Sequence, residues 1–551
     1  MKQKTIIVVG GLSAGPSAAA KARRMDENAR IILFEKTSDI SYATCGMPYA
    51  LSGTIPSRDK LVVVKPELLE KRFRIDVRLE EPVLEIFPEE KKVKTNKGEY
   101  AYDSLVFATG SRGAVPPIPG LAEAKNWAHC RTMGDFDALK AKTDDASAKK
   151  VAVLGAGLIG VEVAENLKMV GKDVVVLEMA PEVLPAWSPA FGKFAGKVLD
   201  ESGLVLKTST KVTSLEVENG EICALVTESG ERIECDFLVL ATGGIPNTDI
   251  LKNKGAECVG NGALVVDENM RTSLPGIFAA GDCAVIKHLI TKKPAYFPLG
   301  THSNKGGRTA GANATGANER FKGAYGTAIV KLFGHTLART GMNGAMLDAE
   351  GVPYKSTFVI GDATPGYYPG QKPVFLKIWY HADDRRLLGA EAFGEKGIDK
   401  RIDVLSVGIY AKLTIDDLPQ LDLAYAPPFS PAKDPVVVAG YVAGNASDLG
   451  FTEIHPEEFE TEKPDDAVVL DVRNPKELEA TGKIFGAVNI PLDQLRDRLD
   501  ELDKSKPVFV YCAKGLRGYL GALVLSHNGF EKVYNISGGM THWKMQGMET
   551  V

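Results

Sequence analysis

Two cysteines stand in contexts that could support thiol chemistry. Cys45 lies in SYATCGMPYA with no second cysteine near it, and Cys512 begins the run Cys-Ala-Lys-Gly-Leu-Arg after the apolar PVFVY. A thiolate attacks a sulfur–sulfur bond to give a mixed disulfide or a persulfide. Alternatively, it cycles through a sulfenic acid, which suits peroxide or oxygen. The remaining sequence has to decide between these chemistries.

The context of Cys512 predicts an anion cradle. A six-residue loop, Cys512 to Arg517, joins a strand-like run to a helix-like run. Backbone N–H groups and the helix dipole in such a loop favour a negative charge, and they stabilise a thiolate. Arg517 is expected to close the far side. The loop suits either a persulfide or a phosphate.

Two βαβ units form the expected framework for these cysteines. The second unit carries GAGLIG from Gly155 to Gly160, a full GxGxxG between a strand and a helix, and Glu178 ends its next strand. Such glycines admit a pyrophosphate, and the acidic residue accepts from a ribose 2′-hydroxyl, which favours NADH over NADPH. The first unit, Gly10 to Gly15, has Leu12 in place of the middle glycine, and Glu35 follows at the acidic position. We expect two dinucleotides, one FAD and one NADH.

Composition excludes several classes of protein. The chain has 551 residues, is 44% hydrophobic and 25% charged, and carries a net charge of −5. These values predict a globular protein of several domains, with neither nucleic acid nor a membrane surface as partner. No apolar run reaches the roughly 18 residues of a membrane span, and no signal peptide is evident. Seven scattered cysteines fit a reducing cytoplasm rather than a disulfide framework, and none has metal-ligand spacing.

The second half of the chain changes character. Runs such as KSTFVIG and VFLKIWYHADDRRLLGAEAFG predict an antiparallel sheet, and RIDVLSVGIYAKL predicts a following helix. The stretch 424–450, which contains proline and glycine, is interpreted as a loop and linker. The last hundred or so residues return to an α/β pattern. Cys130, Cys223, Cys235 and Cys258 fall outside any motif and are interpreted as structural.

The two glycine turns, the two Ala-Thr-Gly segments and TSLPGIFAAGDCA together resemble the pyridine nucleotide–disulfide oxidoreductases. In that family the Asp of Ala-Gly-Asp, here Asp282, bonds the FAD ribityl chain. The resemblance implies FAD-binding residues Gly10, Gly11, Ser13, Ala14, Gly15, Glu35, Lys36, Val83, Ala108, Thr109, Gly110, Arg131, Gly281, Asp282, Pro298 and Leu299. It implies NAD-binding residues Gly155, Gly157, Leu158, Ile159, Gly160, Glu162, Glu178 and Gly243. Cys283 adjoins Asp282, but no redox role is expected for it.

The same resemblance implies an order of domains. We expect an FAD-binding domain from 1–110 and 243–320, an NAD-binding domain from 111–242, and a dimerisation domain from 321–445. The expected fold class is α/β, with two dinucleotide-binding Rossmann-like domains, an α+β dimerisation domain and a C-terminal α/β domain.

SYATCGMPYALSG resembles the single-cysteine branch of this family. Dithiol members have two cysteines in this motif, whereas the position five residues after Cys45 is Ala50. The branch contains coenzyme A disulfide reductases, persulfide reductases, NADH oxidases and NADH peroxidases, and it implies that Cys45 is the redox cysteine beside the flavin. It also implies a homodimer in which Tyr425 and Tyr367, preferred over Tyr368, approach the partner's cysteine. The residues implied to meet coenzyme A are Arg24, Ser41, Arg58, Lys60 and Lys71. Thr44 departs from the usual Asn.

The segment 455–551 resembles a rhodanese domain. The supporting runs are Asp471-Val472-Arg473, Gly486 to Pro491, and Gly538-Gly539-Met540 with Trp543, besides the Cys512 loop. The six-residue loop resembles that of sulfurtransferases, whereas related phosphatases have a longer loop. Lys483 replaces the His of many rhodaneses.

The two resemblances together imply a reductase of persulfide, polysulfide or coenzyme A disulfide bonds. NADH would reduce FAD, FAD would reduce a Cys45 mixed disulfide or persulfide, and Cys512 would relay sulfane sulfur to or from a thiol such as coenzyme A. The alternative enzyme is an NADH oxidase or peroxidase with a Cys45 sulfenic acid. A third hypothesis is a redox-regulated sulfur carrier or sensor.

Overall fold

The computed structural model describes residues 3–551, which form two compact units. One unit holds the residues up to Pro181 together with Gly203–Gly326, and the other holds Glu182–Ser202 and Thr327–Val551. The predicted NAD-binding segment 111–242 therefore contributes Glu182–Ser202 to the second unit. None of the helices in the described part combines the length and apolar character needed to traverse a lipid bilayer.

A five-stranded parallel sheet forms the first half of unit one. Its strand order is β18-β7-β1-β2-β3. The strands are β1 (Thr5–Val9), β2 (Arg30–Phe34), β3 (Ile75–Arg78), β7 (Ser104–Phe107) and β18 (Ile277–Ala279). Strands buried on both faces are apolar throughout, as Ile-Ile-Val-Val of β1 is.

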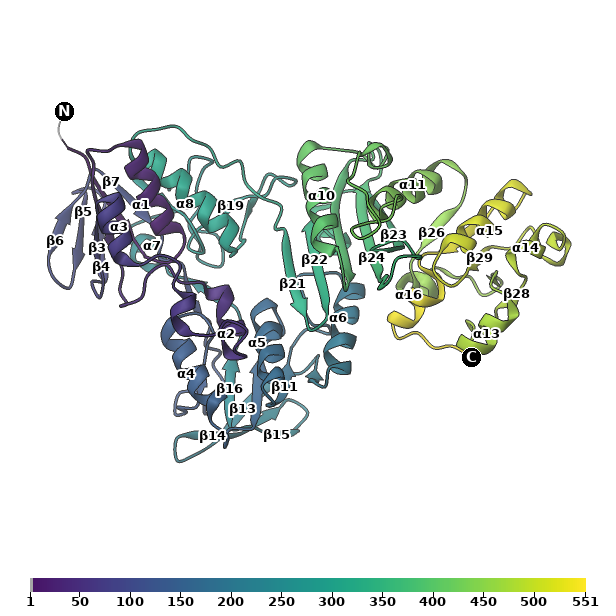
Figure 1. Ribbon diagram of the computed structural model, residues 1–551, viewed down its shortest axis with the longest axis horizontal. Helices are drawn as coiled ribbons and strands as arrows, with labels where there is room; N and C mark the ends of the chain where they lie inside the picture. Colours follow the sequence, from purple (N-terminus) through teal and green to yellow (C-terminus); the bar gives the residue numbers. More distant parts are fainter. Residues whose placement is uncertain (1–2) are drawn as a thin grey trace. The chain divides into compact units, whose positions relative to one another are not determined.

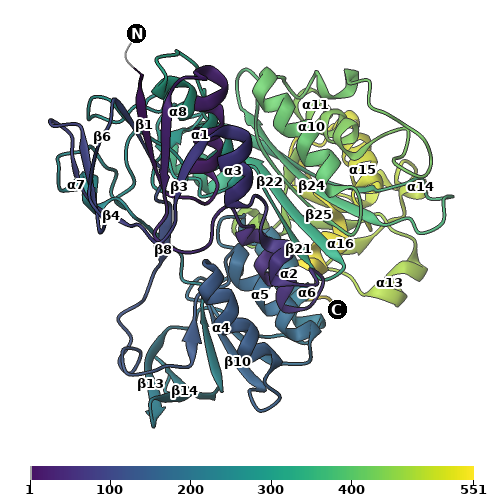
Figure 2. The same ribbon diagram turned by 60° about the vertical axis from the view of Figure 1, so that its left-hand side comes forward.

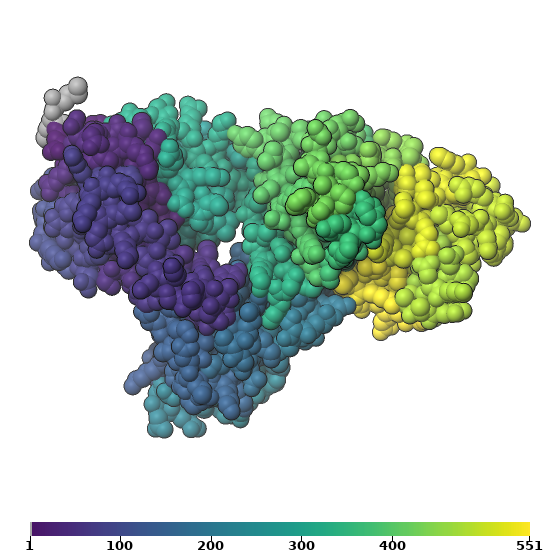
Figure 3. Space-filling model, in the orientation of Figure 1, coloured from purple at the N-terminus to yellow at the C-terminus, as the bar shows by residue number. Residues whose placement is uncertain are grey.

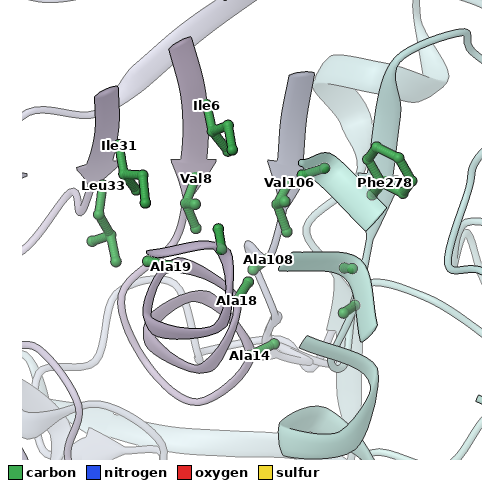
Figure 4. Close-up of a cluster of buried hydrophobic side chains, with 14 of the residues drawn as sticks. Ile6, Val8, Ala14, Ala18, Ala19, Ile31, Leu33, Val106, Ala108 and Phe278 are labelled. Carbon is green, nitrogen blue, oxygen red and sulfur yellow. The ribbon is translucent and has the colours of Figure 1, made fainter. Parts of the chain in front are cut away.

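Helix α1 (Ala14–Met25) covers one face of this sheet and lies beside α8 (Gly300–Ala314) (Figure 1). Figure 4 shows Ile6 and Val8 of β1 and Leu33 of β2 above the alanines of α1. The two helices can approach this closely because Gly311 has no Cβ; a Cβ there would lie 2.1 Å from the Ala18 carbonyl oxygen. This packing holds the start of α1 at the carboxyl edge of the sheet.

The second half of unit one repeats this plan. Its parallel sheet has the order β12-β11-β10-β16-β9. The elements are β9 (Trp127–Ala128), β10 (Lys150–Leu154), β11 (Asp173–Leu177), β12 (Val205–Lys207) and β16 (Phe237–Leu240), with helices α4 (Met133–Asp144) and α5 (Leu158–Met169). An antiparallel sheet of β13 (Val212–Glu218), β14 (Glu221–Thr227) and β15 (Arg232–Glu234) is attached. Both predicted βαβ units are present.

Shorter elements complete unit one. They are η1 (Thr44–Gly46), α2 (Met47–Leu51), η2 (Arg58–Leu61), α3 (Pro66–Phe73), β4 (Val83–Phe87), β5 (Lys92–Thr95), β6 (Glu99–Ala101), β8 (Ser111–Gly113), β17 (Gly244–Pro246), α7 (Asp249–Lys252), β19 (Ile286–Lys287) and β20 (Pro294–Ala295). β8 pairs with β17, the two segments that connect the two halves of the unit.

Unit two contains the predicted antiparallel sheet, in the order β21-β22-β25-β24-β23. The strands are β21 (Ala328–Leu332), β22 (His335–Gly341), β23 (Tyr354–Asp362), β24 (Pro373–His381) and β25 (Leu387–Gly394). α9 (Gly344–Glu350) follows β22, and α10 (Ile398–Ala411) follows β25 and packs on the sheet, as Figure 2 shows. The expected sheet followed by a helix is confirmed.

The interpretation of 424–450 as loop and linker is wrong in its second half. Residues Pro435–Asp448 form α11, a helix of 14 residues that packs on β23. Asp434 caps it by accepting from the Val436 N–H at 3.1 Å, and Pro435 suits the first helical position. Asp434 also binds Arg401 at 2.9 Å, and this pair is buried. The apolar run after Pro435 therefore marks a helix rather than a linker.

Helix α6 (Pro189–Glu201) fills unit two from an earlier part of the chain. Its Phe191 and Phe194 rings lie 6.3 and 6.4 Å from the ring of Phe358 on β23. Phe194 also contacts Phe375 and Phe393. These five rings form an aromatic cluster against the antiparallel sheet.

The C-terminal residues form a parallel sheet of order β26-β30-β29-β27-β28. The strands are β26 (Thr452–Ile454), β27 (Val468–Asp471), β28 (Val488–Asn489), β29 (Val508–Tyr511) and β30 (Val533–Ile536). The helical segments are η4 (Pro456–Glu458), α12 (Phe459–Glu462), α13 (Pro475–Thr481), α14 (Leu492–Leu495), η5 (Leu499–Glu501), α15 (Leu516–His527) and α16 (Gly539–Met545). This region is the yellow part of Figure 3 and adjoins the green antiparallel-sheet region. The predicted α/β fold class is confirmed.

Candidate active site

The first glycine turn follows β1 and needs glycine at two positions. Gly10 has φ +107°, and a Cβ there would lie 2.2 Å from the Ala108 carbonyl oxygen. A Cβ on Gly15 would lie 1.8 Å from the Gly10 carbonyl oxygen. Ser13, the residue before α1, makes no side-chain cap. The first-turn amides of α1 are therefore left for an anion, as a dinucleotide pyrophosphate requires.

The second glycine turn repeats the first. Gly155 has φ +105°, and a Cβ on Gly160 would lie 1.9 Å from the Gly155 carbonyl oxygen. The middle glycine, Gly157, differs: its φ is −74°, and no atom lies within 4 Å of an added Cβ. This geometry explains why Leu12 can stand at the matching position of the first turn.

Each predicted ribose acceptor lies at the mouth of its own turn. Glu35 accepts from the Gly11 N–H at 2.8 Å, and Glu178 accepts from the Ala156 N–H at 2.7 Å. Their second oxygens accept from Thr37 and Ala180 amides, both at 2.9 Å. Both carboxylates are thereby held where a ribose 2′-hydroxyl is expected in this fold.

Asp282 belongs to a polar group at the carboxyl edge of the first sheet. Its carboxylate accepts from Ser111 Oγ at 3.1 Å and lies 3.3 Å from Arg131 Nη2, while Arg131 also bonds Ser111. Gly281 beside it packs against Ala14 of α1. The predicted Ala108-Thr109-Gly110 segment follows β7 at the same edge.

The four remaining predicted FAD contacts lie around this edge. Lys36 follows Glu35, Val83 starts β4, and Pro298 and Leu299 directly precede α8. Carboxyl ends of parallel strands are where this fold binds its ligand. The uncapped α1, the glycine cradle and the Asp282 carboxylate fit FAD.

Cys45 is exposed and lies in η1, directly before α2. Helix α2 is tied to the second glycine unit, since Tyr49 donates from its hydroxyl to Glu162 Oε1 at 2.9 Å. Ser52 Oγ also donates to Asn166 Oδ1 at 2.6 Å. The predicted NAD contact Glu162 is therefore placed beside the helix that follows Cys45.

Tyr49 is a residue that the sequence motifs did not single out. Burial and the Glu162 carboxylate both raise the pKa of its phenol, so Tyr49 stays protonated and acts as a donor. Only its place in MPYALSG, four residues after Cys45, could have suggested a role.

The residues predicted to contact coenzyme A differ in whether their charges are already paired with carboxylates. The Arg58 guanidinium lies between Asp39, at 3.1 Å, and Asp137, at 2.8 Å, and these carboxylates raise the pKa of Arg58. Arg24 lies over the Phe73 ring of α3, 5.1 Å from its centroid. Lys60 and Lys71 are exposed, and Ser41 is buried with φ +47°. Arg24 and Lys71 are on neighbouring helices, α1 and α3.

The Cys512 loop has the predicted cradle geometry. Cys512 is buried at the end of β29, and its sulfur accepts from the Gly515 N–H at 3.1 Å. Gly515 has φ +122°, a conformation that favours glycine. α15 begins one residue later and runs for 12 residues, so its N-terminal amides face the loop.

Arg517 is not unpartnered on the far side of the loop. Its guanidinium donates to both oxygens of Glu477, at 2.7 and 2.6 Å. This pairing lowers the pKa of Glu477 to about 2. No sequence motif pointed to Glu477, although its spacing after Asn474 forms a capping box at the start of α13. The nearby Asp471–Arg473 pair, at 2.6 Å, is fully buried and fixes the end of β27.

Tyr367 and Tyr425 lie side by side in unit two. Their hydroxyl oxygens are 3.3 Å apart, and the residues are 74% and 51% exposed. Large exposed aromatic residues in a pair are characteristic of a contact surface. The residue of this contact is Tyr367, and the preference for Tyr367 over Tyr368 at the partner's cysteine stays a prediction.

All seven cysteines are free thiols. Within residues 3–551, no three His, Cys, Asp or Glu side chains gather in a way that could hold a metal ion. Unit one therefore holds Cys45 and both dinucleotide cradles, and unit two holds Cys512.

Comparison with known families matches three parts of the chain. The pyridine nucleotide-disulphide oxidoreductase family matches residues 4–306, and the dimerisation domain of the same family matches 327–435. The rhodanese-like domain matches 455–546.

Two curated relatives each match about four-fifths of the chain. The NAD(P)H coenzyme A polysulfide/persulfide reductase of Pyrococcus horikoshii is 33% identical over 447 residues, which is 80% of this chain and 98% of the relative. The NADH oxidase of Methanocaldococcus jannaschii is 31% identical over 443 residues, 79% of this chain and 97% of the relative.

Two solved structures match nearly the whole chain. Reduced CoADR-RHD of Bacillus anthracis superposes with a TM-score of 0.95 at 36% identity, covering 99% of this chain and 98% of that one. The NAD-dependent persulfide reductase of A. fulgidus superposes with a TM-score of 0.91 at 37% identity, covering 98% and 100%. The chain therefore belongs to the FAD- and NAD(P)H-dependent pyridine nucleotide–disulphide oxidoreductases and carries a C-terminal rhodanese-like domain.

Proposed function

We propose that this chain reduces sulfur–sulfur bonds of persulfide, polysulfide or coenzyme A disulfide substrates at the expense of NADH. The observation that carries the proposal is the presence of two separate thiol sites in one chain. Cys45 stands before the helix that is bonded to Glu162, and Cys512 lies in an anion cradle. A second cysteine built to carry sulfur favours sulfur substrates over oxygen.

Cys45 is the proposed nucleophile. Its thiolate attacks the outer sulfur of a coenzyme A persulfide, so that coenzyme A thiolate leaves and Cys45 keeps the sulfur as a persulfide. With coenzyme A disulfide, the same attack leaves a Cys45 mixed disulfide. When bound, FAD and NADH would supply the electron pair that cleaves the new bond, so that Cys45 is freed and sulfide or thiol is released. Exposure of Cys45 allows a large substrate to reach it.

Cationic side chains of unit one would hold the phosphates of coenzyme A. Arg24 and Lys71 support this role, because neither side chain forms an ion pair with a carboxylate among residues 3–551. Arg58 is already paired with two carboxylates, so we propose that it contributes less to phosphate binding than Arg24 and Lys71 do. Glu178 at the second glycine turn supports NADH over NADPH, because it would repel a 2′-phosphate.

Cys512 is the proposed sulfur carrier. It would accept a sulfane sulfur as Cys512–S–S⁻, with the charge held by the Gly515 amide and the start of α15. A thiol such as coenzyme A would then remove that sulfur as its own persulfide.

A homodimer and a reducing compartment complete the proposal. Tyr367 and Tyr425 are proposed to approach the partner's Cys45, which their exposure and the matched dimerisation domain support. Seven free thiols support the cytoplasm.

An anaerobic assay tests the proposal. The protein is mixed with NADH and either coenzyme A persulfide or coenzyme A disulfide, and NADH loss and sulfide release are followed, with Cys45→Ser as the control. We expect sulfide in step with NADH loss, and neither in Cys45→Ser. Turnover with the disulfide alone would assign a disulfide reductase. No turnover with either substrate, but NADH consumption with oxygen or peroxide, would contradict the proposal in favour of a sulfenic acid cycle.

A further inference from the structure

The turn Gly538-Gly539, between β30 and α16, is enclosed on two sides. A Cβ on Gly539 would lie 2.2 Å from the carbonyl oxygen of Cys512. A Cβ on Gly538 would lie 2.6 Å from the ring of Phe358. Both glycines have positive φ, +74° and +54°. Only glycine fits here, because the turn lies directly between the Cys512 backbone and the Phe358 ring.

The first turn of α16 holds the Cys512 loop through its backbone. The Met540 N–H donates to the Cys512 carbonyl at 2.8 Å, and the Thr541 N–H donates to the Ala513 carbonyl at 2.9 Å. In a trans peptide the C=O and N–H point in opposite directions. Anchoring these carbonyls to α16 therefore turns the N–H groups of Ala513 and Lys514 away from it. The orientation of the loop amides depends on where α16 lies.

His542 fixes α16 against the antiparallel sheet. Its ring stacks on Phe358 with centroids 3.9 Å apart and 16° between planes. His542 Nδ1 lies 3.0 Å from the Ser537 carbonyl, so that nitrogen carries the proton. Burial lowers the pKa of His542 to about 4, so the stacked ring is neutral at pH 7. Gln546, one turn later, donates to the Ala190 carbonyl of α6 at 3.3 Å.

The ring that supports the loop comes from a different domain of unit two. Phe358 belongs to β23 of the antiparallel sheet, and it lies in the aromatic cluster with Phe191, Phe194 and Phe375. One side chain that supports the Cys512 loop of the rhodanese-like domain therefore comes from the antiparallel sheet.

We infer that Phe358 and His542 are positioning residues for the sulfur-carrying loop, acting through the Gly538-Gly539 turn. The inference rests on the proposed role of Cys512. The antiparallel sheet then sets the direction of the Ala513 and Lys514 amides in the Cys512 loop.

The test compares Phe358→Leu with Phe393→Leu in the full-length protein. Phe393 is equally buried in the same aromatic cluster, where its ring contacts are with Phe194, Phe375 and His335. Alkylation of Cys512 by iodoacetamide is measured against pH, by mass spectrometry of the peptide that carries it. Sulfur transfer from thiosulfate to coenzyme A, thermal unfolding and Cys45-dependent disulfide reduction are measured alongside.

We expect Phe358→Leu to move the midpoint of the alkylation profile up by about one pH unit, because the Ala513 and Lys514 amides of the cradle change direction when α16 shifts. Sulfur transfer should fall about tenfold in parallel. Phe393→Leu should lower the unfolding temperature by a similar amount and leave the profile unchanged. His542→Ala should behave as Phe358→Leu does, whereas His542→Phe keeps the stacked ring and should retain the parent profile.

Two outcomes would overturn the inference. One is an unchanged alkylation profile in both Phe358→Leu and His542→Ala. The other is an equal change in Phe393→Leu, since this would indicate general loss of stability. Failure of the proposed function looks different: the parent would transfer no sulfur, while the alkylation profiles would still show whether Phe358 positions the loop.

Discussion

Cys45 and Cys512 both stand just before a helix, yet the chain surrounds them differently. Cys45 is exposed and precedes α2, which has five residues. Cys512 is buried, precedes a helix of 12 residues and accepts an amide hydrogen bond. A short helix aligns few peptide dipoles. Cys512 therefore has an amide donor and a long helix beside it within its own unit, whereas we expect the Cys45 site to be completed by groups that bind next to it.

The crossed pair of cysteine variants tests this division most strongly. Cys45→Ser should reduce NADH-coupled disulfide reduction by more than about a thousandfold, because the nucleophile is lost, and should leave thiosulfate-to-thiol sulfur transfer intact. Cys512→Ser should abolish thiosulfate-to-thiol sulfur transfer and leave NADH-coupled disulfide reduction intact. Cys258→Ser, which removes a thiol outside both sites, is the matched control and should change neither rate. If either variant abolishes both activities, the sites are not independent.

Tyr425→Phe tests whether the Cys45 site is completed from outside. The proposal places the Tyr425 hydroxyl near the partner's Cys45, so its removal should lower disulfide reduction about 100-fold, the low end of what a positioned proton donor contributes. Sulfur transfer at Cys512 should not change. Tyr441→Phe, another exposed tyrosine of unit two, serves as the control. Equal rates in Tyr425→Phe and the parent would show that the Tyr425 hydroxyl takes no part in disulfide reduction and that the ring only packs.

Glu477→Gln sharpens the other side of the comparison. The change removes the carboxylate that binds both Arg517 nitrogens. The freed guanidinium should then attract an anionic donor, and the KM for thiosulfate should fall about threefold to fivefold, the size of a partly exposed ion pair. Steady-state sulfur transfer measures this, with Glu479→Gln as the neighbouring exposed control. A rise in KM would show that Arg517 needs Glu477 in order to face the loop.

Glu453→Gln is expected to have the smallest effect, on stability rather than rate. Glu453 accepts from Thr357 Oγ1 at 2.7 Å and from Ser537 Oγ at 3.0 Å, and burial raises its pKa to about 7. The folded protein thus keeps a proton that the unfolded chain releases above about pH 4.5, so the parent loses stability as pH rises from there through 7. Calorimetry should show that the unfolding temperature of the glutamine variant, relative to that of the parent, rises as the pH is raised through this range. Glu460→Gln, an exposed change, should follow the parent, and a difference that shrinks with pH would contradict the assignment.

Local motifs made the two dinucleotide cradles predictable. Gly10, Gly15, Gly155 and Gly160 interact with atoms of their own turn and of the adjoining strands, so spacing alone locates them. The acidic residues Glu35 and Glu178 follow within one βαβ unit and bond back to the turn. The Cys512 loop is equally local, and it has the expected cradle.

Contacts between distant segments were not predictable in the same way. The family resemblance implies a coenzyme A contact for Arg58, but the carboxylate of Asp137 that holds it comes from α4. Phe358 gave no motif, and its role depends on Gly538, which is far away in sequence. The helix α11 was missed because Pro435 and the glycines suggested a linker, whereas burial against β23 stabilises it as a helix. Such effects belong to tertiary packing, which residue types alone do not encode.

The origin of α6 has a consequence for how the protein can be made. Phe191 and Phe194 pack inside unit two, although residues Gly203–Gly326 of unit one separate them from the rest of unit two in the chain. During synthesis, this helix leaves the ribosome before the sheet that buries it and must wait with its aromatic face uncovered. A fragment that starts at residue 327 would lack these two rings and expose the faces of Phe358, Phe375 and Phe393 that they cover. The C-terminal unit is thus not a separable module, and a soluble fragment of it should require residues 182–202 supplied as a second piece.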